Sequence, residues 1–192
     1  MNDEDLMSAF ANGDRSAFDP LFERFRDPVF TYLLHLVGHH PVAEDLFQEV
    51  FLRVVRQRAS FEGNTNLSAW IFTIARNVSI DHHRRAATRR ETPGLAPHGY
   101  EALNCSEPEP DRRIESSQLG HRILTALSKL PNAQREVFLL RERAGLEFQA
   151  IAEMTGEKLA TVKSRMRYAL SALREQLESD SKLHLGGRHD QV

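Results

Sequence analysis

The chain has 192 residues, enough for one medium-sized domain or two small ones. Hydrophobic residues make up 41% of it and Cys105 is the single cysteine, which fits a globular protein and excludes internal disulfides. The formal net charge is −2, whereas a protein that binds free DNA strongly by itself is usually basic. No apolar run approaches the roughly 20 residues that span a bilayer, and the acidic start MNDEDLMSAF is unlike a signal peptide. We therefore expect a cytoplasmic protein without membrane insertion.

The first part of the chain, residues 4–85, has helical periodicity almost throughout. Apolar residues recur every three to four positions, as they do on one face of a helix. The runs are Phe18, Leu21, Phe22 and Phe25; Val29, Tyr32, Leu33 and Leu36; Leu46, Val50, Phe51 and Val54; and Trp70, Ile71, Ile74 and Val78. A polar loop, FEGNTNLS, separates the third run from the fourth. This pattern predicts a helical domain over residues 4–85.

The periodicity stops over residues 86–117, where prolines and glycines interrupt the chain. These residues are Pro93, Gly94, Pro97, Gly99, Pro108 and Pro110. Such a composition is typical of a flexible linker that buries little surface. Fully extended, a linker of this length spans on the order of 100 Å, so its two ends can dock far apart on a larger body. Cys105 lies in this segment, and the sequence does not decide whether its thiol has a redox role.

Residues 118–178 are helical again and end in the pattern of a helix-turn-helix. Ile151 and Ala152 fall on the buried face of a short first helix, and Gly156 supplies a turn in which a positive φ is cheapest for glycine. Thr161 is placed to cap the second helix. The apolar face of that second helix comprises Val162, Met166, Ala169, Leu170, Leu173 and Leu177.

Polar and basic side chains gather near the N-terminal end of this second helix. In a helix-turn-helix that end enters the major groove, where Arg pairs with guanine and Lys and Ser reach bases or phosphates. The alternative is an ordinary amphipathic helix with a solvated basic face. The candidate DNA contacts are Thr161, Lys163, Ser164, Arg165, Arg167 and Tyr168.

Four stretches of the sequence, taken in their order along the chain, indicate a resemblance to a known family. They are AEDLFQEVFLRVV at 43–55, FEGNTNLSAWIFTIARNVSIDHHRR at 61–85, LSKLPNAQREVFLLR at 127–141, and the helix-turn-helix. In this order, split by a proline-rich segment, they resemble the extracytoplasmic-function sigma factors of the sigma-70 family, small two-domain subunits of bacterial RNA polymerase. The resemblance implies an all-α fold of two small helical domains, sigma domain 2 and sigma domain 4, joined by a flexible linker.

The resemblance also implies what the first two stretches do. The helix over 43–55 would bind core RNA polymerase, and the candidates on its polar face are Asp45, Gln48, Glu49 and Arg53. The stretch over 61–85 would melt the promoter and recognise its minus-ten element. The candidate contacts there are Phe61, Asn64, Asn66, Trp70, Arg76, Asn77, Arg84 and Arg85.

Physical reasoning leaves alternatives open for several of these minus-ten candidates. Amide side chains can read the edge of an extruded base and an aromatic ring can stack on it. Asn64 and Asn66 also favour turns, however, and Trp70 is more typical of a core than of a base platform. The arginines are expected to hold phosphates, which position the protein without specifying a sequence.

The sequence contains no glycine-rich phosphate loop, nucleophile elbow or paired catalytic carboxylates, so we expect no enzymatic activity, cofactor or metal. The interpretation is an alternative sigma factor that binds core RNA polymerase and promoter DNA. The family implies control by an anti-sigma factor, commonly in a stress response. Three alternatives are an independent helix-turn-helix regulator, a helical interaction protein, and a nucleic-acid enzyme with metal at His82 and His83.

Overall fold

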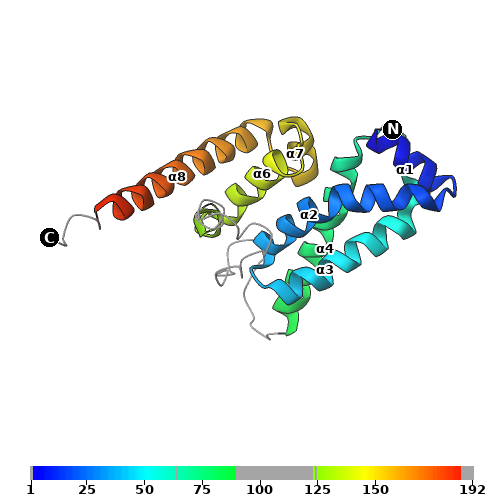
Figure 1. The fold of residues 1–192 in the computed structure, drawn as a ribbon, viewed down its shortest axis with the longest axis horizontal. Helices are drawn as coiled ribbons and strands as arrows, with labels where there is room; N and C mark the ends of the chain where they lie inside the picture. Colours follow the sequence, from blue (N-terminus) through cyan, green and yellow to red (C-terminus); the bar gives the residue numbers. More distant parts are fainter. Residues whose placement is uncertain (1, 64, 90–122, 124, 187–192) are drawn as a thin grey trace.

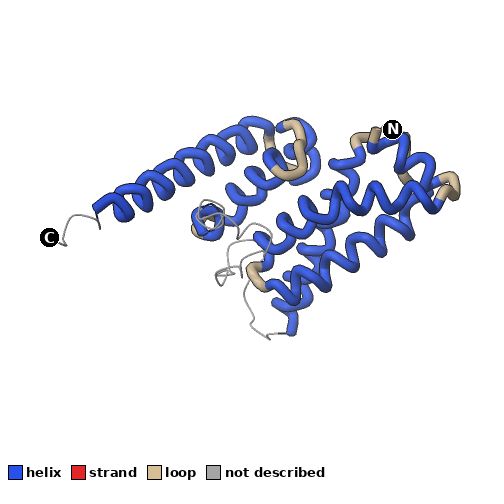
Figure 2. Tube along the Cα trace, viewed as in Figure 1, coloured by secondary structure: helices blue, strands red, loops and turns tan. Residues whose placement is uncertain are grey.

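The computed structural model describes residues 2–63, 65–89, 123 and 125–186, which are mainly helical and include no β-strand (Figures 1 and 2). The N-terminal domain contains α1 (Asp3–Ala11), α2 (Phe18–Val37), α3 (His40–Gln57) and α4 (Leu67–Arg89), with short 3-10 turns at Arg15–Ala17 and Arg58–Ser60. The C-terminal domain contains a helical turn at 125–128, then α6 (Asn132–Glu142), α7 (Phe148–Thr155) and α8 (Leu159–Gly186). The predicted all-α fold of two helical domains is confirmed.

Two features of the N-terminal domain differ from the sequence pattern. The runs on either side of Pro28 belong to one helix, because α2 continues through this proline and ends at Gly38 with a φ of 68°. Helix α4 continues to Arg89, four residues beyond the expected end of the domain. Residues 90–117 of the predicted linker, with Cys105, lie outside the described residues.

The apolar runs form the core that holds the N-terminal helices together. The rings of Tyr32 on α2 and Phe72 on α4 are fully buried and meet edge to face, with centroids 5.3 Å apart. A second aromatic group joins α2 to α3, where Phe22 contacts Phe47 and Phe51. The edge-to-face geometry adds to the stabilisation that burial alone supplies. These contacts hold α2, α3 and α4 side by side, as seen in Figure 1.

In the C-terminal domain the predicted helix-turn-helix is present as α7 and α8. Gly156 ends α7 with a φ of 72°, so the predicted turn glycine is confirmed. The predicted cap at Thr161 is wrong, because α8 already begins at Leu159 and places Thr161 inside its first turn. The apolar face is also narrower than expected, because Leu170 is 49% exposed while Met166 and Leu173 are buried.

The two domains are in contact. Helix α6 packs on α2, and α7 packs on α4 (Figure 1). Buried apolar residues of both domains belong to one continuous cluster. Within the part of the chain that the structure describes, we find no helix with both the length and the hydropathy needed to cross a membrane.

Candidate nucleic-acid interface

The N-terminal end of α8 presents a polar surface. Lys163, Arg167 and Tyr168 are exposed there, Tyr168 by 55%, while Thr161 and Ser164 are half-buried. The guanidinium carbon of Arg167 lies 5.3 Å from the centroid of the Tyr168 ring, within the range of a cation–π contact. The three exposed side chains therefore form one surface that can meet the edges and phosphates of a DNA groove.

Arg165 behaves differently from its neighbours on α8. Its Nη2 donates to Oε1 of Glu157 at 2.8 Å, and its side chain is half-buried. Glu157 directly follows the turn glycine, so the pair bridges the turn and the helix. The positive charge of Arg165 is thus partly neutralised within the helix-turn-helix.

In the loop before α4, side chains expected to bind a base serve the fold. Oδ1 of Asn66 accepts a hydrogen bond from the backbone N–H of Ala69 at 2.8 Å, which caps α4. Phe61 is buried, and its ring meets the half-buried Trp70 ring with centroids 5.6 Å apart. Neither aromatic face is fully presented to a base in this arrangement. Asn64 lies outside the described residues.

Helix α4 carries the remaining minus-ten candidates on its surface. Asn77, Arg84 and Arg85 are exposed. Nη2 of Arg84 lies 2.8 Å from Oδ1 of Asp81, an exposed pair that contributes little to stability and does not prevent a phosphate contact.

The histidines of α4 are adjacent but do not form a metal centre. Burial lowers the pKa of His83, and the neighbouring His82 lowers it further. In the described residues, we find no three His, Cys, Asp or Glu side chains close enough to hold a metal ion.

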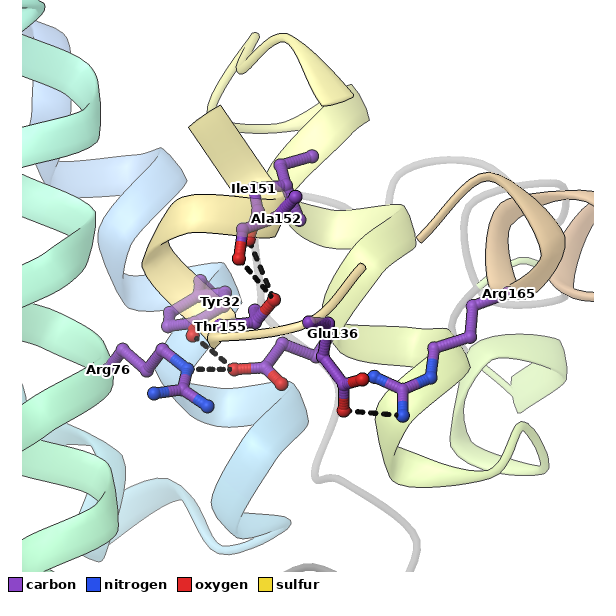
Figure 3. A network of polar contacts seen from close by, with 8 residues as sticks. Tyr32, Arg76, Glu136, Ile151, Ala152, Thr155 and Arg165 are labelled. Atoms are coloured by element: carbon purple, nitrogen blue, oxygen red, sulfur yellow. Dashed lines mark hydrogen bonds and ion pairs between the residues drawn. The ribbon is translucent and has the colours of Figure 1, made fainter. Parts of the chain in front are cut away.

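Arg76 on the same helix faces the other domain (Figure 3). Its Nε donates to Oε1 of Glu136 on α6 at 3.0 Å, and the hydroxyl of Tyr32 donates to the same oxygen at 3.2 Å. Glu136 is only 4% exposed. Burial raises the pKa of its carboxyl, whereas Arg76, Tyr32 and the more distant Arg165 act to lower it. The sequence does not reveal a role for Glu136, because its partners lie in a different domain.

Arg135, the residue before Glu136, is also buried, at 3% exposure. Its guanidinium donates to four backbone carbonyls at 2.6–2.9 Å, those of Leu127, Ser128, Leu130 and His35. Three of these belong to the turn before α6, and the fourth belongs to the end of α2. Arg135 therefore organises the start of the C-terminal domain and also contacts the N-terminal domain.

The candidate polymerase surface lies on α3. Asp45 and Gln48 are exposed, and Nε of Arg53 lies 2.7 Å from Oε1 of Glu49. This pair offsets the repulsion between the carboxylates of Asp45 and Glu49, which lie four residues apart on the helix. Leu52, which was not among the candidates chosen from the sequence, is 49% exposed although it is apolar. The signal was present, since Leu52 falls outside the periodic run that includes Val50, Phe51 and Val54.

Nη1 of Arg53 lies 3.6 Å from Oδ2 of Asp81 on α4. One guanidinium thus links α3 to α4, which carry the two predicted surfaces of the N-terminal domain. We infer that Arg53 is tied into the structure more tightly than a free surface contact would be.

Comparisons with known proteins agree with this two-domain layout. The family model of Sigma-70 region 2 matches residues 21–89, and that of Sigma-70 region 4 matches residues 120–173. The ECF RNA polymerase sigma factor SigW of Bacillus subtilis is 30% identical over 172 residues, which cover 86% of this chain and 91% of SigW. The chain belongs to the extracytoplasmic-function (ECF) family of RNA polymerase sigma factors.

Other ECF sigma factors give the same result. EcfG of Rhodopseudomonas palustris is 32% identical over 174 residues, covering 87% of this sigma factor and 92% of EcfG. SigE of Mycolicibacterium smegmatis is 32% identical over 175 residues, covering 89% of this chain but 66% of SigE. Among solved structures, the sigma factor RpoE of Bartonella quintana, in complex with the anti-sigma factor NepR, is similar with a TM-score of 0.68 and 27% identity. That match covers 85% of this chain and 98% of RpoE.

Proposed function

We propose that this ECF sigma factor binds core RNA polymerase and directs it to a specific set of promoters, as a regulatory subunit without catalysis of its own. The proposal rests above all on the family membership, which covers both domains. Its place of action would be the cytoplasm, where RNA polymerase works.

In the N-terminal domain, α3 and α4 would share the work. Asp45, Gln48 and Leu52 on α3 would contact polymerase, because they are exposed together on one helix. A partner could bury the exposed half of the Leu52 side chain, and removing this apolar area from water would stabilise the complex. On α4, Asn77 would contact a base while Arg84 and Arg85 hold phosphates, since all three side chains are exposed.

In the C-terminal domain, the first turns of α8 would enter the major groove of the minus-thirty-five element. Lys163, Arg167 and Tyr168 are the strongest candidates, because their side chains reach solvent. Arg165 would serve chiefly to shape the turn, because Glu157 already holds its guanidinium.

An anti-sigma factor would keep this activity in check. The support is the similarity to RpoE, which was solved together with the anti-sigma factor NepR. Release from such a partner would then link transcription to a signal, as in a stress response.

Run-off transcription tests the proposal directly. Purified core polymerase is incubated with a library of promoter fragments, with and without the protein. We expect initiation at a discrete promoter set only when the protein is present. Absence of stimulation, together with failure to co-elute with core polymerase, would overturn the proposal.

A matched pair of variants on α8 tests the assignment of the minus-thirty-five surface. Arg167→Ala is expected to lower initiation at the identified promoters about tenfold or more, because a good side-chain contact to a base contributes roughly 1–3 kcal/mol. Arg174→Ala removes the same charge from an exposed position further along the helix. It is expected to leave initiation unchanged, and equal losses in both variants would contradict the assignment.

A further inference from the structure

The contact between the two domains contains a buried carboxylate that accepts its hydrogen bonds from the other domain. Glu136 is buried on α6 of the C-terminal domain, and both hydrogen bonds recorded at its carboxylate come from the N-terminal domain. One donor is Arg76 on α4 and the other is Tyr32 on α2 (Figure 3). A buried carboxylate is costly without such partners. Glu136 is therefore suited to hold the domains together, and less suited to stabilise its own domain.

Two further polar contacts surround this carboxylate. Oγ of Ser68 at the start of α4 donates to the carbonyl of Ala144 at 2.6 Å. Nη1 of Arg135 donates to the carbonyl of His35 at 2.8 Å. Within the described residues, the domains thus share polar contacts as well as an apolar cluster. The contact has a defined geometry, with Glu136 and Arg76 as its ion pair.

The partner of Glu136 has a second use. Arg76 belongs to the candidate minus-ten residues, whose arginines would hold DNA phosphates. A carboxylate and a phosphate oxygen are alternative partners for the same guanidinium, since both accept its charge-assisted hydrogen bonds. While Arg76 is paired with Glu136, its side chain is half-buried and its Nε–H is already used by the carboxylate.

We propose that Glu136 acts as an internal substitute for a promoter phosphate, which holds the free sigma factor closed by binding Arg76. The inhibitory part of this proposal rests on the promoter function proposed above. Opening would release Arg76 to DNA and free the C-terminal domain to move. The chain between Arg89 and Ile123 is long enough for this, because its residues when extended span on the order of 100 Å.

Distance measurements on the free, full-length protein test the closed state. In a Cys105→Ser background, Ala59→Cys in the N-terminal domain and Arg174→Cys on α8 provide exposed label sites. Double electron–electron resonance measures the distance between spin labels on these two cysteines. It is expected to give one narrow distance distribution for this parent. Glu136→Gln is expected to give a broad distribution with the closed fraction reduced about tenfold, because a hydrogen bond to a charged group contributes at least that factor.

Matched variants show whether the ion pair is responsible. Glu142→Gln changes an exposed carboxylate on the same helix and is expected to leave the distribution narrow. Tyr32→Phe removes one hydrogen bond with little change in packing, so it is expected to open a smaller fraction. The double variant Arg76→Gln, Glu136→Gln is expected to open no further than either single variant, because the two residues act as one pair. Identical distributions in all variants, with folding verified by circular dichroism, would overturn the proposal.

A functional readout separates the closed state from its consequence. Glu136→Gln is expected to speed promoter-complex formation with core polymerase several-fold at limiting protein, whereas Arg76→Gln opens the protein but slows this step. If Glu136→Gln opens the protein without speeding the complex, the inhibitory role is overturned. If no variant and no parent protein supports transcription at any promoter, the proposed function fails, while the distances still report the Glu136 contact.

Discussion

The guanidinium of Arg165 on α8 is joined to the carboxylate of Glu157 in the preceding turn, with Nη2 and Oε1 2.8 Å apart. The pair joins Glu157, the residue after the turn glycine Gly156, to α8, the helix that is expected to enter the major groove. Glu157 therefore places a negative charge close to the expected path of the DNA. It also neutralises the positive charge of Arg165 on α8. Both effects oppose binding to phosphates.

Replacing Glu157 is therefore expected to strengthen DNA binding. Glu157→Gln should raise the affinity of the polymerase complex for promoter DNA about two- to fivefold, and should steepen the salt dependence by about one counterion, since one more cation becomes available. Filter binding or fluorescence anisotropy across a salt series measures both quantities. Glu153→Gln, an exposed carboxylate on α7, is the control for loss of charge alone. A weaker complex in Glu157→Gln would show that Glu157 positions Arg165 for binding instead.

The exposed leucine on α3 makes a second prediction about the polymerase surface. Leu52→Ser is expected to weaken binding to core polymerase about fivefold, because polymerase would bury the exposed half of a side chain whose full burial contributes about 1.5–3 kcal/mol. It should leave the thermal unfolding curve unchanged, because the side chain is 49% exposed. Competition with a labelled sigma factor for core polymerase measures this affinity. Gln57→Ser, exposed at the end of the same helix, should bind as the parent does. Equal affinities in all three proteins would place the polymerase contact elsewhere.

Whether a structural feature could be predicted from the sequence depends on how far apart in the chain the interacting residues lie. The apolar runs predicted the helices, and Gly156 predicted the turn, because both signals are local. Met166 is buried and Leu170 is not, because the neighbouring helices cover only part of the apolar face of α8. Periodicity alone does not define how wide the covered part is. Periodicity alone also does not show that α2 continues through Pro28, a residue type that usually interrupts a helix. Buried residues lie on α2 both before and after this proline.

The same distinction between local and distant interactions applies to the residues of the candidate site. Exposed residues such as Arg167 and Asn77 could be chosen by residue type and helical position. The roles of Arg76 and Arg135 could not, because their partners lie on helices that are distant in sequence and meet only in the folded chain. Tyr32 and Glu136 are separated by 104 residues. No local pattern encodes a contact of that range.

The buried guanidinium of Arg135 makes a prediction about stability. Arg135→Met keeps most of the apolar stem but removes the guanidinium from four carbonyls, of which that of Leu127 also accepts the backbone N–H of Leu130, so it should lower the free energy of unfolding by about 3–5 kcal/mol. For a chain of this size, that loss corresponds to a fall in Tm of roughly 10 °C. Differential scanning calorimetry measures it, with Lys129→Met as an exposed control. A change below about 1 kcal/mol would mean that water replaces the guanidinium at these carbonyls.

His35 makes the corresponding prediction about pH. It is buried at the end of α2 and its pKa is lowered to about 4, by burial first and then by the positive charges of Arg135 and Arg143. Among the described residues, neither ring nitrogen has a hydrogen-bond partner. The unfolded chain binds this proton near pH 6.5, whereas the folded chain binds it only near pH 4. Unfolding therefore takes up a proton between these values, and stability falls as the pH falls.

The expected size follows from linkage. The His35 contribution should reduce the free energy of unfolding by up to about 1.4 kcal/mol for each pH unit below 6.5, reaching roughly 3 kcal/mol near pH 4. Glu136 acts in the opposite sense, because a raised carboxyl pKa means that the charged form is disfavoured in the fold as the pH rises. Since the parent and His35→Leu both retain Glu136, its contribution cancels when the two proteins are compared.

Urea unfolding of the parent and His35→Leu from pH 7.5 to pH 4.5 measures the difference. The variant should be at least as stable at pH 7.5, because leucine fills the site without unpaired polar atoms, and its advantage should grow steadily below pH 6.5. His39→Asn, which alters an exposed histidine at the N-cap of α3, should differ from the parent by a constant amount across the range, because Asn is favoured at an N-cap. A constant difference between His35→Leu and the parent across the range would show that His35 does not gain a proton on unfolding, and that the low-pH loss of stability has another source.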